Sequence, residues 1–161
     1  MSDLLDVKLV IDKNCQKLDV VITSRERNED VEGLLAAIQA YADKQIPMIP
    51  AYFKDSLVML PQRQIIRIYT ANRKVILQTT DMMYEVKKPL TELEEILDPD
   101  LFVRISQSEI LNLRKVKSFD FSLAGTIGVE LENGESTYVA RRRVKNVKEA
   151  LQRGGPDGYK N

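Results

Sequence analysis

The segment that decides the fold lies at residues 126–139 and reads TIGVELENGESTYV. Two short runs of apolar and β-branched residues, 126–131 and 136–139, flank the dipeptide Asn133-Gly134. Runs of this kind predict β-strands, and Asn-Gly between them is the strongest short hairpin signal, because both residues accept the positive φ angles of a tight turn. The segment therefore predicts an antiparallel hairpin within a β-rich domain.

Similar runs predict further strands at residues 56–60, 65–70, 74–79, 82–86, 102–105 and 116–121. The helical spacing of Leu90, Leu93 and Leu97 after Pro89 predicts one clear helix, and residues 143–151 form a second, shorter candidate. The Gly-rich residues 154–161 are expected to be a flexible tail. We therefore expect a mainly β (α+β) domain over residues 51–153.

A small ββα segment is expected to precede this domain, over residues 1–50. Residues 7–11 and 18–23 predict two strands, and Asn28 is a suitable N-cap for a helix that continues to about Asp43. Pro47 and Pro50 then prevent a helix and indicate a linker. Such a segment is too small to form its own core, so we expect a dimerisation or regulatory role, or simple cover for the sheet.

Composition indicates a globular, cytoplasmic protein. Of the 161 residues 43% are hydrophobic and 30% charged, and no apolar stretch approaches the length of a membrane span. The amino terminus is acidic, unlike a signal peptide, and the single cysteine, Cys15, cannot form an internal disulfide. Both features are expected of a protein in a reducing compartment.

Several kinds of catalytic chemistry are missing from the sequence. The chain has no histidine, one cysteine and no Gly-rich phosphate-binding loop, which excludes Cys/His zinc sites and the commonest general base. We expect no enzyme activity, no metal or other cofactor, and no small-molecule substrate. A hydrolase that activates Ser106 or Ser108 through a lysine remains an alternative.

Three consecutive arginines, Arg141, Arg142 and Arg143, directly follow the predicted hairpin. Guanidinium groups are always charged, and their planar fork matches phosphate oxygens and the edge of guanine. Residues 101–153 contain ten Lys/Arg and six Asp/Glu, a modest field of the right sign for a polyanion, whereas residues 1–50 contain six and nine. The cluster therefore favours nucleic acid as partner, with an acidic protein surface as the alternative.

The order of these features resembles the LytTR family of bacterial DNA-binding domains over about residues 55–152. The resemblance depends on the phasing of Leu90, Leu93 and Leu97, on residues 102–113 (FVRISQSEILNL), on Asn133-Gly134, and on residues 139–142 (VARR). It implies an elongated β domain that binds double-stranded DNA with loops in successive major grooves. A sequence-specific transcriptional regulator, bound as a homodimer to tandem half-sites, is the expected function.

The family also suggests which residues contact DNA. Base contacts fall on Arg73, Gln107 and Arg142, and the neighbouring residues Asn72, Ser106, Arg141 and Arg143 would contact phosphates or share in base readout. Two residues depart from the family pattern. Family members often have His at or next to the position of Gln107 and Ser at the position of Ala140. Asn112 matches the family, but we interpret it as a structural amide that bonds a turn.

The resemblance finally suggests how the protein is controlled. Response regulators with this domain usually carry a phosphoacceptor receiver of more than about a hundred residues, whereas about 50 residues precede the domain here. We therefore expect a receiverless regulator that is not switched by phosphorylation. Some short family members are paired with a membrane protein that restrains them, so such a regulator is a possible partner.

Overall fold

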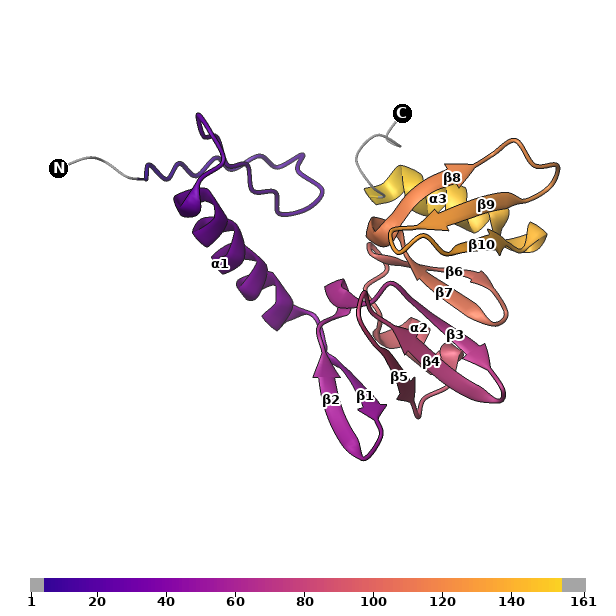
Figure 1. Cartoon of the computed structure of the whole chain (residues 1–161). Coiled ribbons are helices and arrows are strands. Elements are labelled where there is room, and N and C mark those ends of the chain that lie inside the picture. Colours follow the sequence, from indigo (N-terminus) through magenta and orange to yellow (C-terminus); the bar gives the residue numbers. More distant parts are fainter. Residues whose placement is uncertain (1–4, 155–161) are drawn as a thin grey trace. The chain divides into compact units, whose positions relative to one another are not determined.

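The computed structural model describes residues 5–154 (Figure 1). The chain divides into two compact units between Ile38 and Gln39. Mainly antiparallel β-sheets with a few short helices make up the second unit, as the sequence predicted. Within the described part of the chain, no helix combines the length and apolar character that a membrane span requires.

A seven-stranded antiparallel sheet has the order β2-β1-β5-β4-β3-β7-β6. Its strands are β1 (Ile49–Phe53), β2 (Ser56–Leu60), β3 (Arg67–Ala71), β4 (Lys74–Gln78), β5 (Met83–Val86), β6 (Phe102–Ser106) and β7 (Glu109–Asn112). A three-stranded antiparallel sheet, in the order β10-β9-β8, contains β8 (Val116–Asp120), β9 (Ile127–Leu131) and β10 (Ser136–Val139). The predicted hairpin is confirmed, since β9 and β10 pair across Asn133-Gly134.

Two hydrophobic cores hold these sheets. In the first, helix α2 (Leu90–Ile96) buries Leu90 and Leu93 against the seven-stranded sheet. In the second, helix α3 (Val144–Gly154) and the three-stranded sheet pack around Ile105 and Leu111. Each core buries a dozen or so apolar side chains, so both contribute strongly to the stability of this unit.

Strand β7 separates the two cores and was not predicted. All four of its residues are buried, with Ile110 in the first core and Leu111 in the second. A strand covered on both faces lacks the polar and apolar alternation of a half-exposed strand, and Glu109 and Asn112 at its ends make it look like a loop. Asn112 confirms the structural interpretation, because its amide donates to the Ile65 carbonyl at 2.8 Å and accepts from Arg114 N–H at 2.9 Å.

A polar cluster joins the edges of the two sheets. The Arg67 guanidinium lies 3.2 Å from the Glu109 carboxylate and 2.6 Å from that of Glu135, which follows the Asn133-Gly134 turn. The hydroxyl of Thr137 on β10 donates to Glu109 at 2.8 Å. Because Glu109 begins β7 directly after the β6–β7 turn, the cluster fixes this turn relative to β10.

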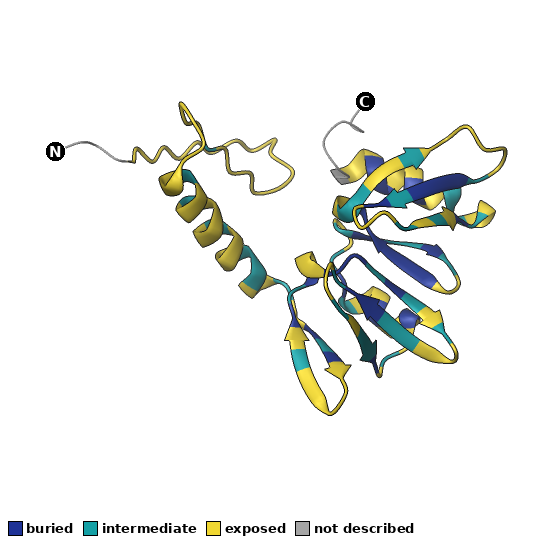
Figure 2. Ribbon diagram, in the orientation of Figure 1, coloured by how far each residue is buried: buried dark blue, intermediate teal, exposed yellow. Residues whose placement is uncertain are grey.

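The first unit differs from the predicted ββα segment. Helix α1 (Glu29–Gln45) is present, and the Asn28 side chain caps it by accepting from Val31 N–H at 3.0 Å. The strands predicted at residues 7–11 and 18–23 are wrong, because these residues form coil and turns. Figure 2 colours almost all of these residues as exposed, and a strand pattern that pairs with no neighbouring strand is not stable by itself.

The remaining differences are at element ends. Strand β1 begins at Ile49, within the predicted proline linker, and Pro50 is tolerated in it as the partner of Met59. Helix α3 begins at Val144, one residue after its predicted start, because Arg141–Arg143 form a 3-10 turn before it. The predicted tail at residues 154–161 lies outside the described residues except for Gly154, which ends α3.

A candidate DNA interface

The three segments predicted to contact DNA lie in sequence order along one edge of the second unit. The β3–β4 turn and the β6–β7 turn are neighbours, because Thr70 N–H donates to the Ser108 carbonyl at 2.9 Å. The 3-10 turn Arg141–Arg143 lies next to β6, because Ala140 N–H donates to the Ile105 carbonyl at 2.8 Å. Figure 1 shows these three connections on the right of the molecule, at the tips of β3, β6 and β10.

The β3–β4 turn presents Asn72 and Arg73, both of them exposed. Their φ angles are +52° and +64°, values that a two-residue hairpin turn requires and that an Asn-Gly pair would meet with less strain. An arginine in the second position costs on the order of 1 kcal/mol of backbone strain relative to glycine.

The β6–β7 turn presents Gln107 and Ser108, and Ser106 is half-buried beneath them. Arg104 holds this turn from inside, since its guanidinium donates to the Ser106 carbonyl at 2.9 Å and to the Gln107 carbonyl. The same guanidinium lies 3.4 Å from the Glu94 carboxylate on α2. Arg104 therefore fixes the position of the turn that carries Gln107.

The arginine triplet is not uniform in its environment. Arg141 and Arg142 are exposed, whereas Arg143 is half-buried and its Nε has no hydrogen-bond partner among residues 5–154. From the sequence, the three arginines were expected to act as one cluster of positive charge. A 3-10 turn advances about 120° per residue, which separates their directions. The triplet thus offers two side chains to solvent and one to the interior of the domain.

A fourth segment, the β8–β9 loop, adjoins this edge and was not singled out in the sequence. A Cβ atom added at Gly125, which has a φ of +74°, would lie 3.3 Å from Arg141 Nε. At the start of the loop the Asp120 carboxylate accepts hydrogen bonds from the hydroxyl and backbone N–H of Ser122, and these bonds lower its pKa. The loop therefore limits where the Arg141 side chain can lie.

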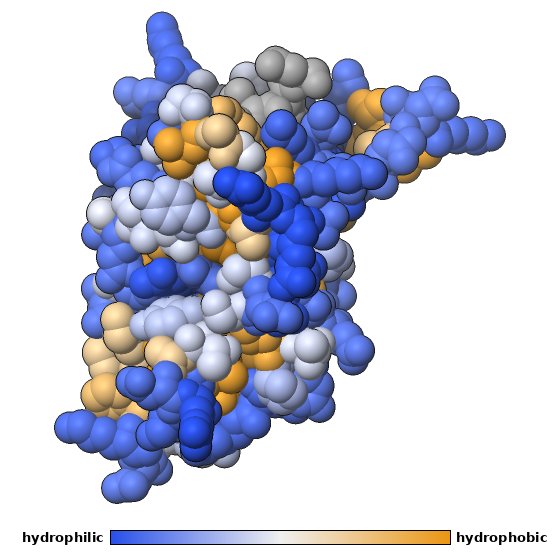
Figure 3. Space-filling view, turned by 90° about the vertical axis from the view of Figure 1, so that its right-hand side faces the viewer, coloured by the Kyte–Doolittle hydropathy of each residue, from blue (hydrophilic) through white to orange (hydrophobic). Residues whose placement is uncertain are grey.

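The surface of this edge suits a charged, hydrated partner. Figure 3 looks onto it and shows mostly hydrophilic side chains with smaller apolar areas between them. The exposed residues at the three tips include Asn72, Arg73, Gln107, Arg141 and Arg142. These are donors of the kinds that contact phosphates and base edges.

Comparison with known families identifies this fold. The model of the LytTr DNA-binding domain matches residues 55–152. The chain belongs to the LytTR family. The match includes all three tips and most of both cores, and it excludes the whole of α1.

Two relatives from Staphylococcus aureus differ in how much of their length this chain covers. The chain is 34% identical over 103 residues to the transcriptional regulatory protein LytR of Staphylococcus aureus (strain N315). The match covers 64% of this chain and 42% of that protein. The chain thus spans less than half the length of LytR. It is also 27% identical over 148 residues to an uncharacterized HTH-type transcriptional regulator of Staphylococcus aureus (strain NCTC 8325 / PS 47), covering 92% of this chain and 99% of that one.

A solved structure supports the fold directly. The LytTr DNA-binding domain of a Bacillus cereus protein superposes with a TM-score of 0.62 at 20% identity, over 65% of this chain and 96% of that chain. At this identity the likeness concerns the fold alone.

Proposed function

We propose that this protein regulates transcription by binding specific sequences in double-stranded DNA through the three tips. The observation that carries the proposal is their alignment on one edge by two backbone hydrogen bonds, Thr70 to Ser108 and Ala140 to Ile105. Arg73, Gln107 and Arg142 stand at separate tips and contact bases in the major groove. Asn72, Ser106, Arg141 and Arg143 contact phosphates or share in the readout.

The proposal is tested first by selecting bound sequences from a random duplex pool. Enrichment of a defined motif is expected, and its repeat spacing gives the number of half-sites. Failure to enrich any motif, with binding that depends only on salt, would leave the edge as a nonspecific basic surface. Tight binding to an acidic protein and none to DNA would favour the interaction module instead.

The role of Arg142 is tested by Arg142→Ala in the full chain. We expect specific affinity to fall by about 1–3 kcal/mol, because a bidentate contact to guanine has that value, with an unchanged fold because the side chain is exposed. Fluorescence anisotropy with the selected operator measures the effect. Unchanged affinity would remove Arg142 from the readout.

Gln107 and Arg141 offer a matched pair for separating base readout from phosphate contact. Gln107→Ala should relax preference at one base pair and leave the salt dependence of binding unchanged, since an amide releases no counterions. Arg141→Ala should lower affinity for all sequences and reduce the salt slope by about one. If instead Gln107→Ala changes the slope more, the two roles are exchanged.

We further propose that residues 5–38 mediate homodimerisation on tandem half-sites. Eight large apolar side chains within residues 5–21 are exposed: Leu5, Val7, Leu9, Val10, Ile11, Leu18, Val20 and Val21. A group of exposed apolar side chains of this kind is typical of a surface that binds a partner. A membrane protein that restrains the regulator is a second partner for the same surface.

A further inference from the structure

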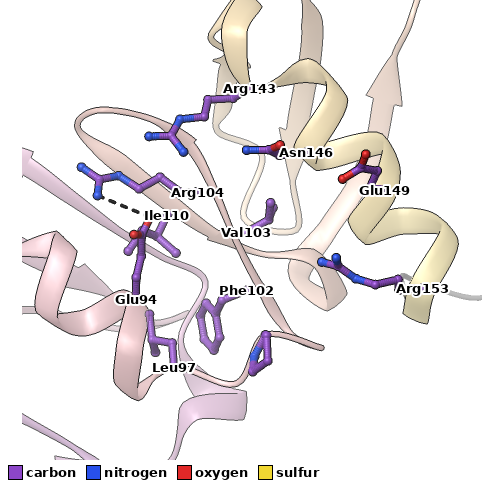
Figure 4. Close-up of a pocket in the computed structure, with 11 residues that line it drawn as sticks. Glu94, Leu97, Phe102, Val103, Arg104, Ile110, Arg143, Asn146, Glu149 and Arg153 are labelled. Carbon is purple, nitrogen blue, oxygen red and sulfur yellow. Dashed lines mark ion pairs between the residues drawn. The ribbon is translucent and has the colours of Figure 1, made fainter. Parts of the chain in front are cut away.

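A cleft between α2 and α3 adjoins the third tip, and Arg143 of that tip is one of the residues that line it. Its volume is about 310 Å³, at the lower end of the range of small-molecule sites. Figure 4 shows strand β6 crossing its floor, α2 on one side and α3 on the other. The apolar part of the lining consists of Leu97, Pro99, Phe102, Val103 and Ile110.

The charged part of the cleft is dominated by arginine. Arg104 and Arg143 extend into the same end of it (Figure 4), and Arg153 lines the other end. Two carboxylates, Glu94 and Glu149, line it as well, so the cleft carries a net charge of about +1 from these five groups. Like charges brought together in a partly desolvated cleft repel, and an anion between them would remove that repulsion.

The hydrogen bonding of Arg143 is incomplete, whereas the three guanidinium nitrogens of Arg104 all have partners within the chain. Arg104 uses its Nε and one terminal nitrogen for the β6–β7 turn, and its other terminal nitrogen lies 3.4 Å from Glu94, which is a long contact. Nε of Arg143 is buried, and no residue within 5–154 accepts a hydrogen bond from it. A buried guanidinium N–H without an acceptor is costly, so Arg143, which lines the cleft, has one donor available to a ligand.

We infer that this cleft binds a small organic anion, with its carboxylate or phosphate between Arg104 and Arg143 and its apolar part over Phe102 and Val103. Anion binding in the cleft does not depend on the proposed function. The effect of the bound anion on DNA affinity does rest on it. Arg104 holds both carbonyls of the Ser106-Gln107 turn, so an anion on Arg104 changes the position of Gln107. The same anion neutralises Arg143, which immediately precedes α3.

The direct test uses the full chain without DNA and sodium benzoate as probe. Benzoate is titrated at constant ionic strength while amide chemical shifts are followed by NMR. Saturable shifts are expected at Phe102, Val103 and Asn146, and at Ser106–Ser108 because of Arg104, but not at Asn72 and Arg73. Benzyl alcohol, a neutral molecule of similar shape, should cause no saturable shifts at these positions.

The matched variants are Arg143→Gln and Arg141→Gln, two equal substitutions on one 3-10 turn. Arg143→Gln should weaken benzoate binding about tenfold, the value of one charge-assisted hydrogen bond. Arg141 is exposed and does not line the cleft, so Arg141→Gln should leave binding unchanged. Equal effects of the two variants would overturn the inference.

Inorganic phosphate, used as a second probe, distinguishes a site for a small organic anion from a site for a backbone phosphate of DNA. Benzoate should bind several-fold more tightly than phosphate, because the apolar floor contributes only to benzoate. Equal affinity for both, or no saturable shift with benzoate, would overturn the organic-anion site. Since these measurements need no DNA, their failure is distinct from failure of the proposed function, which only the duplex selection decides.

Discussion

The two units of this chain have similar apolar sequence patterns but differ in how far their apolar side chains are buried. Residues 39–154 convert their apolar runs into sheets that enclose two cores, whereas residues 5–38 leave nearly all of theirs in water. Leu111 in β7 is fully buried, and Leu9 is 81% exposed. The difference teaches that a strand pattern is stabilised by the surface that it covers, because hydrogen bonds between isolated strands are marginal in water.

The largest expected effect comes from exchanging a leucine for alanine in each unit. Leu111→Ala should reduce the free energy of unfolding by about 2–5 kcal/mol, since it leaves a cavity in the second core. Leu9→Ala should change it by less than about 0.5 kcal/mol when the protein is dilute enough to be monomeric. Urea denaturation followed by circular dichroism measures both. Similar losses would mean that residues 5–38 are packed in solution.

A smaller effect is expected from the polar cluster that joins the sheets of the second unit. Arg67→Met should cost about 1–3 kcal/mol, because Glu109 loses its charged partner in a largely buried position. Lys117→Met is the control, since Lys117 pairs with Glu130 at 3.5 Å on an exposed surface and should cost about 0–1 kcal/mol. A stabilising Arg67→Met would show that packing outweighs the ion pairs there.

The smallest expected effect on stability comes from removing residues 1–38 altogether. The shortened chain keeps both cores and the ion pair of Asp43 with Arg63 at 2.7 Å, so its free energy of unfolding should change by less than about 0.5 kcal/mol. Its sedimentation mass should nevertheless fall from that of a dimer to that of a monomer. Its affinity for two tandem half-sites should decrease as effective concentration is lost.

Two results would contradict this last expectation. Equal mass and equal two-site affinity for both proteins would mean that residues 5–38 do not mediate dimerisation. A large loss of stability would mean that they cover the sheet within one chain. The unfolding measurement distinguishes the second result from the first.

The sequence by itself determined the β-rich class, the hairpin at Asn133-Gly134 and most strand positions. These features depend on local chemistry: β-branched residues favour extended backbone, and Asn-Gly favours the tight turn. It also favoured a structural role for Asn112, because Asn side chains commonly make local hydrogen bonds to turns. The candidate residues at the three tips were likewise chosen from the sequence.

Only the tertiary structure decided how those residues relate to one another. Backbone hydrogen bonds between distant segments bring the tips to one edge, and Arg104 shapes the Gln107 turn through contacts that no spacing along the chain predicts. Strand β7 escaped prediction because burial on both faces removes the alternation that marks a strand. The strands predicted at residues 7–11 and 18–23 did not form for the converse reason, since alternation without a surface to cover gains no burial energy.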